Sequence, residues 1–158
     1  MSGAINLKRA MLPAALAIAF MAAVSAQDKP NFAGKWKAAG SFNSWTITVE
    51  GSKMTVTMMV AGNTDSTEYL LDGTPAIKTI EGPNGPIETV RTSTWEGHVL
   101  VTSTKISNGS ASIEKRWLEP DGTMRVQNTL TMLQGKPAPP PPPGAGAGMT
   151  LTKVGGAR

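Results

Sequence analysis

The side chains that could carry acid–base chemistry are few and far apart. His98 is the chain's one histidine, and it follows Glu96 and Gly97 at a hairpin signal. A histidine that acts as a general base needs an orienting carboxylate and a nucleophile beside it. Glu96 is near His98 only along a turn, where such pairs are usually solvated, and the pattern forces none of the eleven Asp and Glu residues together. We therefore expect no catalytic residues and no enzymatic activity.

The residue types also argue against metals, cofactors and nucleic acid. The chain has no cysteine, which excludes thiol nucleophiles, cysteine-based zinc sites and iron–sulfur clusters. One histidine is too few for the usual catalytic zinc site. The fifteen Lys and Arg residues are scattered, and after residue 26 only Lys115 and Arg116 are adjacent. A nucleic-acid surface needs a basic stripe or patch, so we expect no such partner.

Large apolar residues are the stronger candidates for a site. Methionine is adaptable and polarizable, and a cavity walled by Met and Trp with a few Thr groups suits a lipophilic ligand. An eight-stranded barrel is just wide enough to be filled by side chains or to hold one small molecule, and both outcomes stay open here. The candidate cavity-lining residues are Trp45, Met54, Met58, Trp95, Trp117, Met124 and Met132.

Arg91 is a candidate anion anchor, because it shares a predicted strand face with Ser93 and Trp95. If that face points inward, the guanidinium could pair with a ligand carboxylate, since a buried charge needs a partner. If the face points outward, Arg91 is an ordinary surface residue, and this simpler orientation is the one we expect.

These residues must be positioned by strands, because apolar and polar residues alternate along most of the chain after residue 26. Trp45, Ile47 and Val49, for example, alternate with Thr46 and Thr48. Successive strand side chains point to opposite faces, and Asn-Gly and Asp-Gly pairs between the runs favour tight hairpins. The predicted strands are 34–39, 44–50, 53–60, 65–71, 75–80, 87–96, 98–106, 111–118, 123–133 and 148–154.

The order of strands and turns predicts an all-β, up-and-down antiparallel meander of eight to ten strands. Closure into a barrel would remove the exposed edges of such a meander. A two-sheet sandwich is the competing arrangement, but no long crossover connection is visible, so a barrel is favoured.

Two proline-rich segments interrupt the pattern. Residues 81–86 contain two prolines and predict a rigid turn at which strand pairing stops. Residues 135–148 contain five consecutive prolines at 139–143, followed by alternating Gly and Ala. The proline run predicts extended polyproline II, which could dock in an aromatic-lined groove of a partner. The simpler interpretation is an inserted loop before the last strand, which costs little entropy.

The first twenty-six residues have the order of a secretory signal peptide. Lys8 and Arg9 precede an apolar run over 11–24, and small residues lead to a predicted cleavage between Ala26 and Gln27. The apolar run is shorter than the roughly 20 residues that span a bilayer. We therefore expect a secreted or periplasmic domain over 27–158, without stable membrane insertion; an uncleaved anchor is the alternative. Without 1–26 the net charge would be +2, from thirteen basic and eleven acidic residues.

The segment 31–36, with Gly34 and Trp36, resembles the Gly-x-Trp signature that opens the first strand of lipocalins. In order and spacing the pieces over 30–154 are similar to small secreted lipocalin-like domains of bacteria. The resemblance implies a calycin-type barrel in which Trp36 plugs the closed end. It also implies a basic residue of the last strand across that ring, and Lys153 is the only candidate, where Arg would stack better.

Together these observations predict an exported lipocalin-like protein that binds a small apolar or amphipathic molecule non-covalently in the barrel. The alternative is a structural or interaction module with a filled core, acting through its proline-rich loop or a sheet edge. The protein partner of such a loop is not identified by the sequence.

Overall fold

The computed structural model describes residues 29–143 and 148–155. The predicted signal peptide and its cleavage between Ala26 and Gln27 lie outside the described residues, and so does part of the 135–148 loop. No helix in the described ranges is long and apolar enough to cross a membrane.

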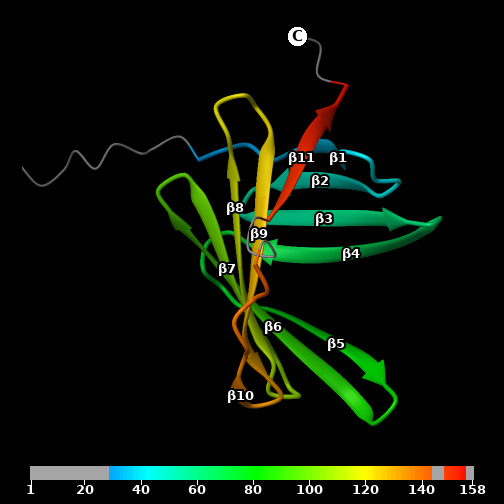
Figure 1. Ribbon diagram of the computed structural model, residues 1–158, viewed down its shortest axis with the longest axis vertical. Coiled ribbons are helices and arrows are strands. Elements are labelled where there is room, and N and C mark those ends of the chain that lie inside the picture. Colours follow the sequence, from blue (N-terminus) through cyan, green and yellow to red (C-terminus); the bar gives the residue numbers. More distant parts are fainter. Residues whose placement is uncertain (1–28, 144–147, 156–158) are drawn as a thin grey trace, which may run out of the picture.

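Antiparallel strands make up most of the described chain, and each predicted strand is present to within two residues at either end (Figure 1). The short strand β10 was not predicted. The strands are β1 (Gly34–Ala38), β2 (Ser44–Glu50), β3 (Lys53–Val60), β4 (Asn63–Leu70), β5 (Ala76–Gly82), β6 (Gly85–Glu96), β7 (Val99–Ile106), β8 (Ala111–Leu118), β9 (Met124–Leu133), β10 (Lys136–Pro137) and β11 (Met149–Val154).

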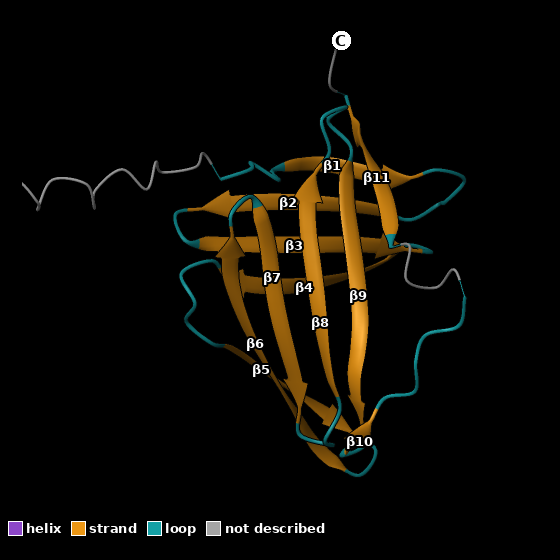
Figure 2. Ribbon diagram, turned by 60° about the vertical axis from the view of Figure 1, so that its left-hand side comes forward, coloured by secondary structure: helices purple, strands orange, loops and turns teal. Residues whose placement is uncertain are grey.

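The strands form one sheet in the order β4-β3-β2-β1-β11-β9-β8-β7-β6-β5, with β10 paired to β9. Neighbours in this order are consecutive in the chain except where β11 lies between β1 and β9, so the predicted meander is confirmed. The sheet curls until β1–β4 cross the inner side of the long strands β6–β9 (Figures 1 and 2). The result is a nearly closed barrel with its two edges at β4 and β5.

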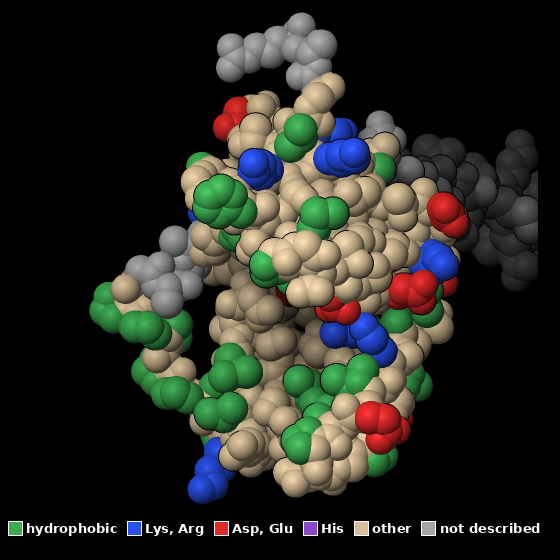
Figure 3. All heavy atoms as spheres, turned by 90° about the vertical axis from the view of Figure 1, so that its right-hand side faces the viewer, with side chains coloured by type: hydrophobic (Ala, Val, Ile, Leu, Met, Phe, Trp, Pro, Cys, Tyr) green, Lys and Arg blue, Asp and Glu red, His purple; other side chains and the backbone are tan. Residues whose placement is uncertain are grey.

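The two edges of the sheet are joined by side chains rather than by a backbone ladder. Lys78 Nζ on β5 lies 3.4 Å from Asp65 Oδ1 on β4 and donates to the Ser66 carbonyl at 3.2 Å. The surface on this side of the molecule is hollowed, with basic and acidic side chains at the margin of the hollow (Figure 3). On this side of the barrel Lys78 therefore bridges the two edges of the sheet.

Strand pairing continues through the proline-rich turn at 81–86, contrary to the prediction. Gly82 pairs with Gly85 and Glu81 pairs with Pro86. Antiparallel residues alternate between pairs that exchange hydrogen bonds and pairs that do not. The closing pair of a two-residue hairpin, here Gly82 and Gly85, exchanges hydrogen bonds. The next pair, Glu81 and Pro86, does not, so the missing N–H of Pro86 costs no hydrogen bond between β5 and β6. Pairing of β6 with β7 begins only at Thr89.

A register shift between β8 and β9 changes which side chains of β9 face inward. Ser112 pairs with Leu130, whereas the preceding residue, Ala111, pairs with Met132. One extra residue on β9 at this point is a bulge, and it reverses the facing of everything beyond it. Met132 consequently shares the outer face with Ala111.

The end of the barrel where β1 begins is packed around Trp36, and we call it the packed end. Trp36 is 1% exposed, and its Nε1 donates to the Phe32 carbonyl at 2.8 Å. Lys153 pairs with Trp36 across β1 and β11, and its Nζ lies 5.6 Å from the centre of the indole. Gly34 has φ +139°, and a Cβ there would lie 2.5 Å from Lys153 Cε, so glycine suits this crossing.

Candidate ligand-binding cavity

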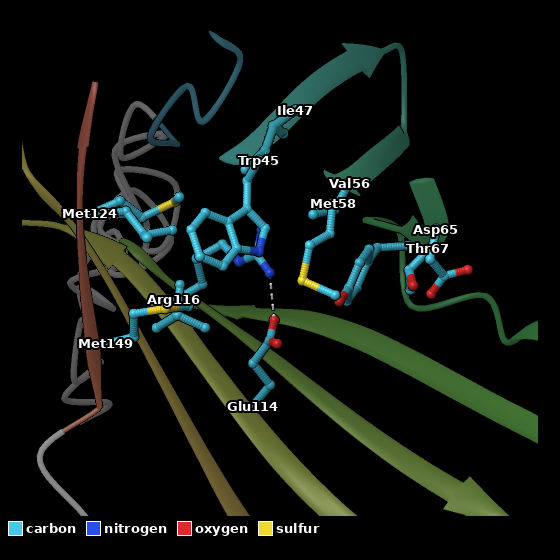
Figure 4. Close-up of a pocket in the computed structure, with 13 residues that line it drawn as sticks. Trp45, Ile47, Val56, Met58, Asp65, Thr67, Glu114, Arg116, Met124 and Met149 are labelled. Carbon is cyan, nitrogen blue, oxygen red and sulfur yellow. Dashed lines mark hydrogen bonds and ion pairs between the residues drawn. The ribbon is translucent and has the colours of Figure 1, made fainter. Parts of the chain in front are cut away.

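A cavity of about 220 Å³ lies inside the barrel between the two crossing layers of strands (Figure 4). Its wall is mostly apolar, with two carboxylates, one guanidinium, one phenol and one threonine. The lining residues are Trp45, Ile47, Val56, Met58, Asp65, Thr67, Tyr69, Glu114, Arg116, Met124, Val126, Met149 and Leu151.

Strand alternation explains why these residues meet. The contributions come from every second residue of β2, β3, β4, β8, β9 and β11, which are the inward positions of those strands. Because β2–β4 cross the other strands, the lining residues between 45 and 69 face those between 114 and 151. Neither layer could enclose the cavity alone.

Arg116 is the unusual member of the wall, because a charged side chain is only 4% exposed. Its Nη2 lies 2.8 Å from Glu114 Oε1, and the Glu114 side chain is 17% exposed. The guanidinium carbon lies 5.4 Å from the centre of the Tyr69 ring. Burial of a cation is costly unless it is paired, and here a carboxylate and an aromatic face share that role.

Arg116 is not fully satisfied by these contacts. Its Nε is buried and has no hydrogen-bond partner among the described residues. A buried donor without an acceptor costs roughly 1–3 kcal/mol.

The phenol beside Arg116 is held neutral. Burial raises the pKa of Tyr69, and the Glu114 carboxylate raises it further, while the charges of Arg116 and Arg91 act in the opposite direction. Tyr69 is 7% exposed. The cavity therefore offers a phenol hydroxyl, and not a phenolate, at neutral pH.

Three of the seven predicted cavity residues line the cavity, namely Trp45, Met58 and Met124. Met54 is wholly buried in the core and does not reach the cavity wall. Met132 is turned to the outer face by the bulge in β9.

The other two predicted cavity residues, Trp117 and Trp95, lie elsewhere. Trp117 neighbours Arg116 on β8, so it points away from the cavity, and its Nε1 donates to Glu119 at 2.9 Å. Trp95 is inside the barrel but at the Phe32 end, where the two rings stack with centres 5.8 Å apart and planes 7° apart. Trp95 lines a separate, more open groove with Lys29 and Leu71.

Arg91 lies on the inner face of β6, so the expected outward orientation is wrong. It alternates in register with Ser93, which is 1% exposed and shares a 2.9 Å hydrogen bond with Thr102. Arg91 does not line the cavity itself; it lines a hollow at the gap between β4 and β5, together with Glu68 and Lys78. Its role as an anion anchor stays a prediction.

Arg116, Glu114 and Tyr69 were not among the predicted site residues. Glu114 and Arg116 are two residues apart on one strand, so alternation places them on the same face. The face of β8 with Glu114 and Arg116 is charged, and a charged strand face is usually assigned to solvent. Nothing in the local pattern of β8 shows that β2–β4 cover it.

The structure brings no further residues to the candidates for acid–base catalysis or metal binding among the described residues. His98 is exposed in the turn between β6 and β7. The described residues contain no group of three or more His, Cys, Asp or Glu side chains that could hold a metal ion.

Comparison with known proteins shows the fold. No protein-family model matches the chain, and no curated protein does. Among solved structures the chain is similar to the REP1-NXSQ fatty acid transporter, with 14% identity over 77% of this chain and 95% of that one and a TM-score of 0.52. The fold is that of the calycin-type barrels. A mutant of the fluorescent protein UnaG is also similar, with 16% identity, 78% and 96% coverage and a TM-score of 0.53. At such identities the calycin-type likeness concerns the fold alone.

Proposed function

We propose that this protein binds one small apolar or amphipathic molecule, non-covalently, in the cavity between the crossing strands, and that it does so after export. The single observation that carries the proposal is the mostly apolar cavity of about 220 Å³ with a buried, incompletely hydrogen-bonded Arg116 in its wall. No catalytic step is part of the proposal.

Burial of apolar surface would supply most of the binding free energy, at roughly 25 cal/mol per Å² before the costs of ordering. Trp45, Met58, Met124 and Met149 present aromatic and thioether surfaces that adapt to different shapes. The similar fatty acid transporter supports a small hydrophobic ligand, since the two proteins share the calycin-type barrel. The gap between β4 and β5 is the proposed way in, because Asp65 both lines the cavity and holds Lys78 across that gap.

The size of the cavity limits the ligand. Pockets for drug-sized ligands occupy about 300–1,000 Å³, whereas an apolar cavity of about 150 Å³ holds benzene. A cavity of about 220 Å³ therefore suits one ring with a short substituent better than a long acyl chain.

A matched pair of substitutions on β4 tests the proposal. Thr67 lines the cavity and Thr64 is exposed on the same strand, so Thr67→Phe fills the cavity while Thr64→Phe adds the same side chain outside. A panel of single-ring apolar compounds should quench or shift tryptophan fluorescence and raise Tm in the wild type and Thr64→Phe, but not in Thr67→Phe. Absence of any response from the wild type across the panel would contradict the proposal.

Export is tested separately. Expression of the full chain in a bacterium with a periplasm should yield a periplasmic product whose mass corresponds to a start at Gln27. A product that keeps residues 1–26 would argue for the anchor alternative.

A further inference from the structure

Two neighbouring turns of the barrel present large apolar side chains to solvent. The turn between β1 and β2 carries Phe42, which is 100% exposed, and β3 ends at Met59 and Val60, which are 50% and 38% exposed. Ser44, two residues after Phe42, pairs with Met59, so the two turns lie side by side, on the right in Figures 1 and 2. We call Phe42, Met59 and Val60 the apolar tip. Neighbouring exposed apolar side chains of this kind are typical of an interaction surface.

Two lysines of β1 flank the apolar tip. Lys37 pairs with Ser44, which in turn pairs with Met59, so these three side chains form one outward row across β1, β2 and β3. Lys37 also lines an open hollow together with Phe42. Lys35 is the other outward lysine of β1. Both lysines are exposed, and neither makes an ion pair within the described residues.

The strands around these lysines carry almost no negative charge. In the adjoining strands β11, β1, β2 and β3 the one acidic residue is Glu50, which lies at the opposite end of β2 from Phe42. Figure 3 views the molecule from the side of the two turns and shows basic side chains next to hydrophobic ones on its upper part. Exposed apolar groups beside uncompensated cations complement a bilayer, whose interior is apolar and whose anionic headgroups are negative.

We infer that the apolar tip, with Lys35 and Lys37, is a docking surface for a lipid bilayer that contains anionic headgroups. The protein adsorbs with Phe42, Met59 and Val60 in the headgroup layer and with the two ammonium groups beside lipid phosphates. None of these five residues lines the ligand cavity. The inference therefore goes beyond the proposed function and does not depend on it.

A fluorophore at the tip tests where the protein meets the bilayer. The chain has no cysteine, so Phe42→Cys provides a single attachment site for a polarity-sensitive dye. His98→Cys is the matched control, because His98 is exposed in the turn between β6 and β7, on the opposite side of the molecule in Figures 1 and 2. With the product recovered after export, phosphatidylcholine vesicles containing roughly 30% phosphatidylglycerol should shift the emission to shorter wavelength at residue 42 but not at residue 98. Vesicles of phosphatidylcholine alone should shift neither.

A pair of double substitutions tests the contribution of the lysines. Each cation near an anionic bilayer strengthens adsorption about fivefold, so Lys35→Gln with Lys37→Gln should weaken binding to the anionic vesicles about tenfold or more. Lys105→Gln with Lys115→Gln removes the same net charge from exposed positions on β7 and β8, and it should change binding less than about twofold. Sedimentation with the vesicles measures both variants beside the wild type.

Several results would overturn the inference. One is the absence of a shift at residue 42 with the anionic vesicles, and another is an equal shift at residue 98. Equal losses from the two lysine pairs would show that net charge alone causes adsorption. A shift at residue 42 that grows with protein concentration without vesicles would assign the apolar tip to a second copy of this chain. The comparison of residues 42 and 98 is decisive even if a lysine variant fails to fold, because both residues are exposed in turns.

Discussion

Three cations lie over aromatic rings among the described residues, and the two that lie on strands, Lys153 and Arg116, differ in their surroundings. At the packed end, Lys153 Nζ lies 5.6 Å from the centre of the Trp36 ring, and Lys153 is exposed. In the cavity, the Arg116 guanidinium lies 5.4 Å from the centre of the Tyr69 ring and is buried. The geometry of the two contacts is alike, but the surroundings are not.

The two contacts differ in whether the buried hydrogen-bond donors and charges have partners. Trp36 is buried with its one donor paired to Phe32, and the charge of Lys153 stays in water. Arg116 is buried with its charge, needs Glu114 to offset it, and still has an unmatched Nε. The contact of Lys153 with Trp36 leaves no buried donor unpaired, whereas the contact of Arg116 with Tyr69 does; among the described residues the same is true only of Trp95 Nε1.

The packed end should be the more costly to disturb. Trp36→Ala would remove a large, fully buried side chain and leave a cavity, at a cost of about 3–5 kcal/mol. Urea unfolding followed by circular dichroism measures the loss. A loss below about 1 kcal/mol would mean that Trp36 does not anchor this end of the barrel.

Breaking the pair in the cavity should cost slightly less. Glu114→Ala would leave Arg116 buried without its carboxylate, and removal of one partner of a buried pair costs about 3–5 kcal/mol; the partial exposure of Glu114 places the loss near the lower limit. The double variant Glu114→Leu with Arg116→Met should be more stable than Glu114→Ala, because it leaves no unpaired charge. A double variant that is less stable than Glu114→Ala would show that the ion pair itself stabilises the barrel.

The exposed cation should matter much less than the buried one. Lys153→Met keeps the aliphatic stem across Trp36 and removes only the charge, so the cost should be about 0.5–1 kcal/mol. Equilibrium unfolding beside wild type measures this. A loss as large as that of Glu114→Ala would erase the contrast between the two contacts.

A pH titration should reveal the buried phenol. Burial raises the pKa of Tyr69 in the folded state above its ordinary value of 10.0. Above pH 10 the unfolded chain therefore releases a proton that the folded chain still holds, and stability falls as pH rises. Below pH 10 this contribution is constant. Tyr69 is the only tyrosine, so tyrosinate absorbance of the folded protein reports its pKa directly, and Tyr69→Phe should lack the corresponding part of the alkaline loss.

The proline-rich loop, through which the alternative function would act, can be tested by deletion. Residues 139–143 are exposed in the structure, as a docking segment requires. Deletion of 138–147 should leave Tm and ligand binding unchanged if the segment is only an insertion. Loss of a specific partner without loss of stability would support the interaction role.

Strand positions could be predicted because a strand records its facing in every second residue. Trp45 and Met58 were assigned to the interior on that basis, and both line the cavity. The same rule failed for Met132, because a bulge of one residue reverses the facing and carries no strong sequence signal. Trp117 was assigned to the cavity because of its residue type, and the structure places it on the face opposite its neighbour Arg116, as alternation requires.

The sequence by itself determined the order and approximate bounds of all strands but β10, and the meander that joins them, because these depend on local alternation and on glycine-containing turns. Only the tertiary structure decided that β2–β4 cross the inner face of β8 and β9, and so that Arg116 and Glu114 are buried beside Tyr69. Burial of a charge depends on what lies across the barrel from it, and that neighbour is set by the curl of the whole sheet and not by the residues on either side of it in the chain.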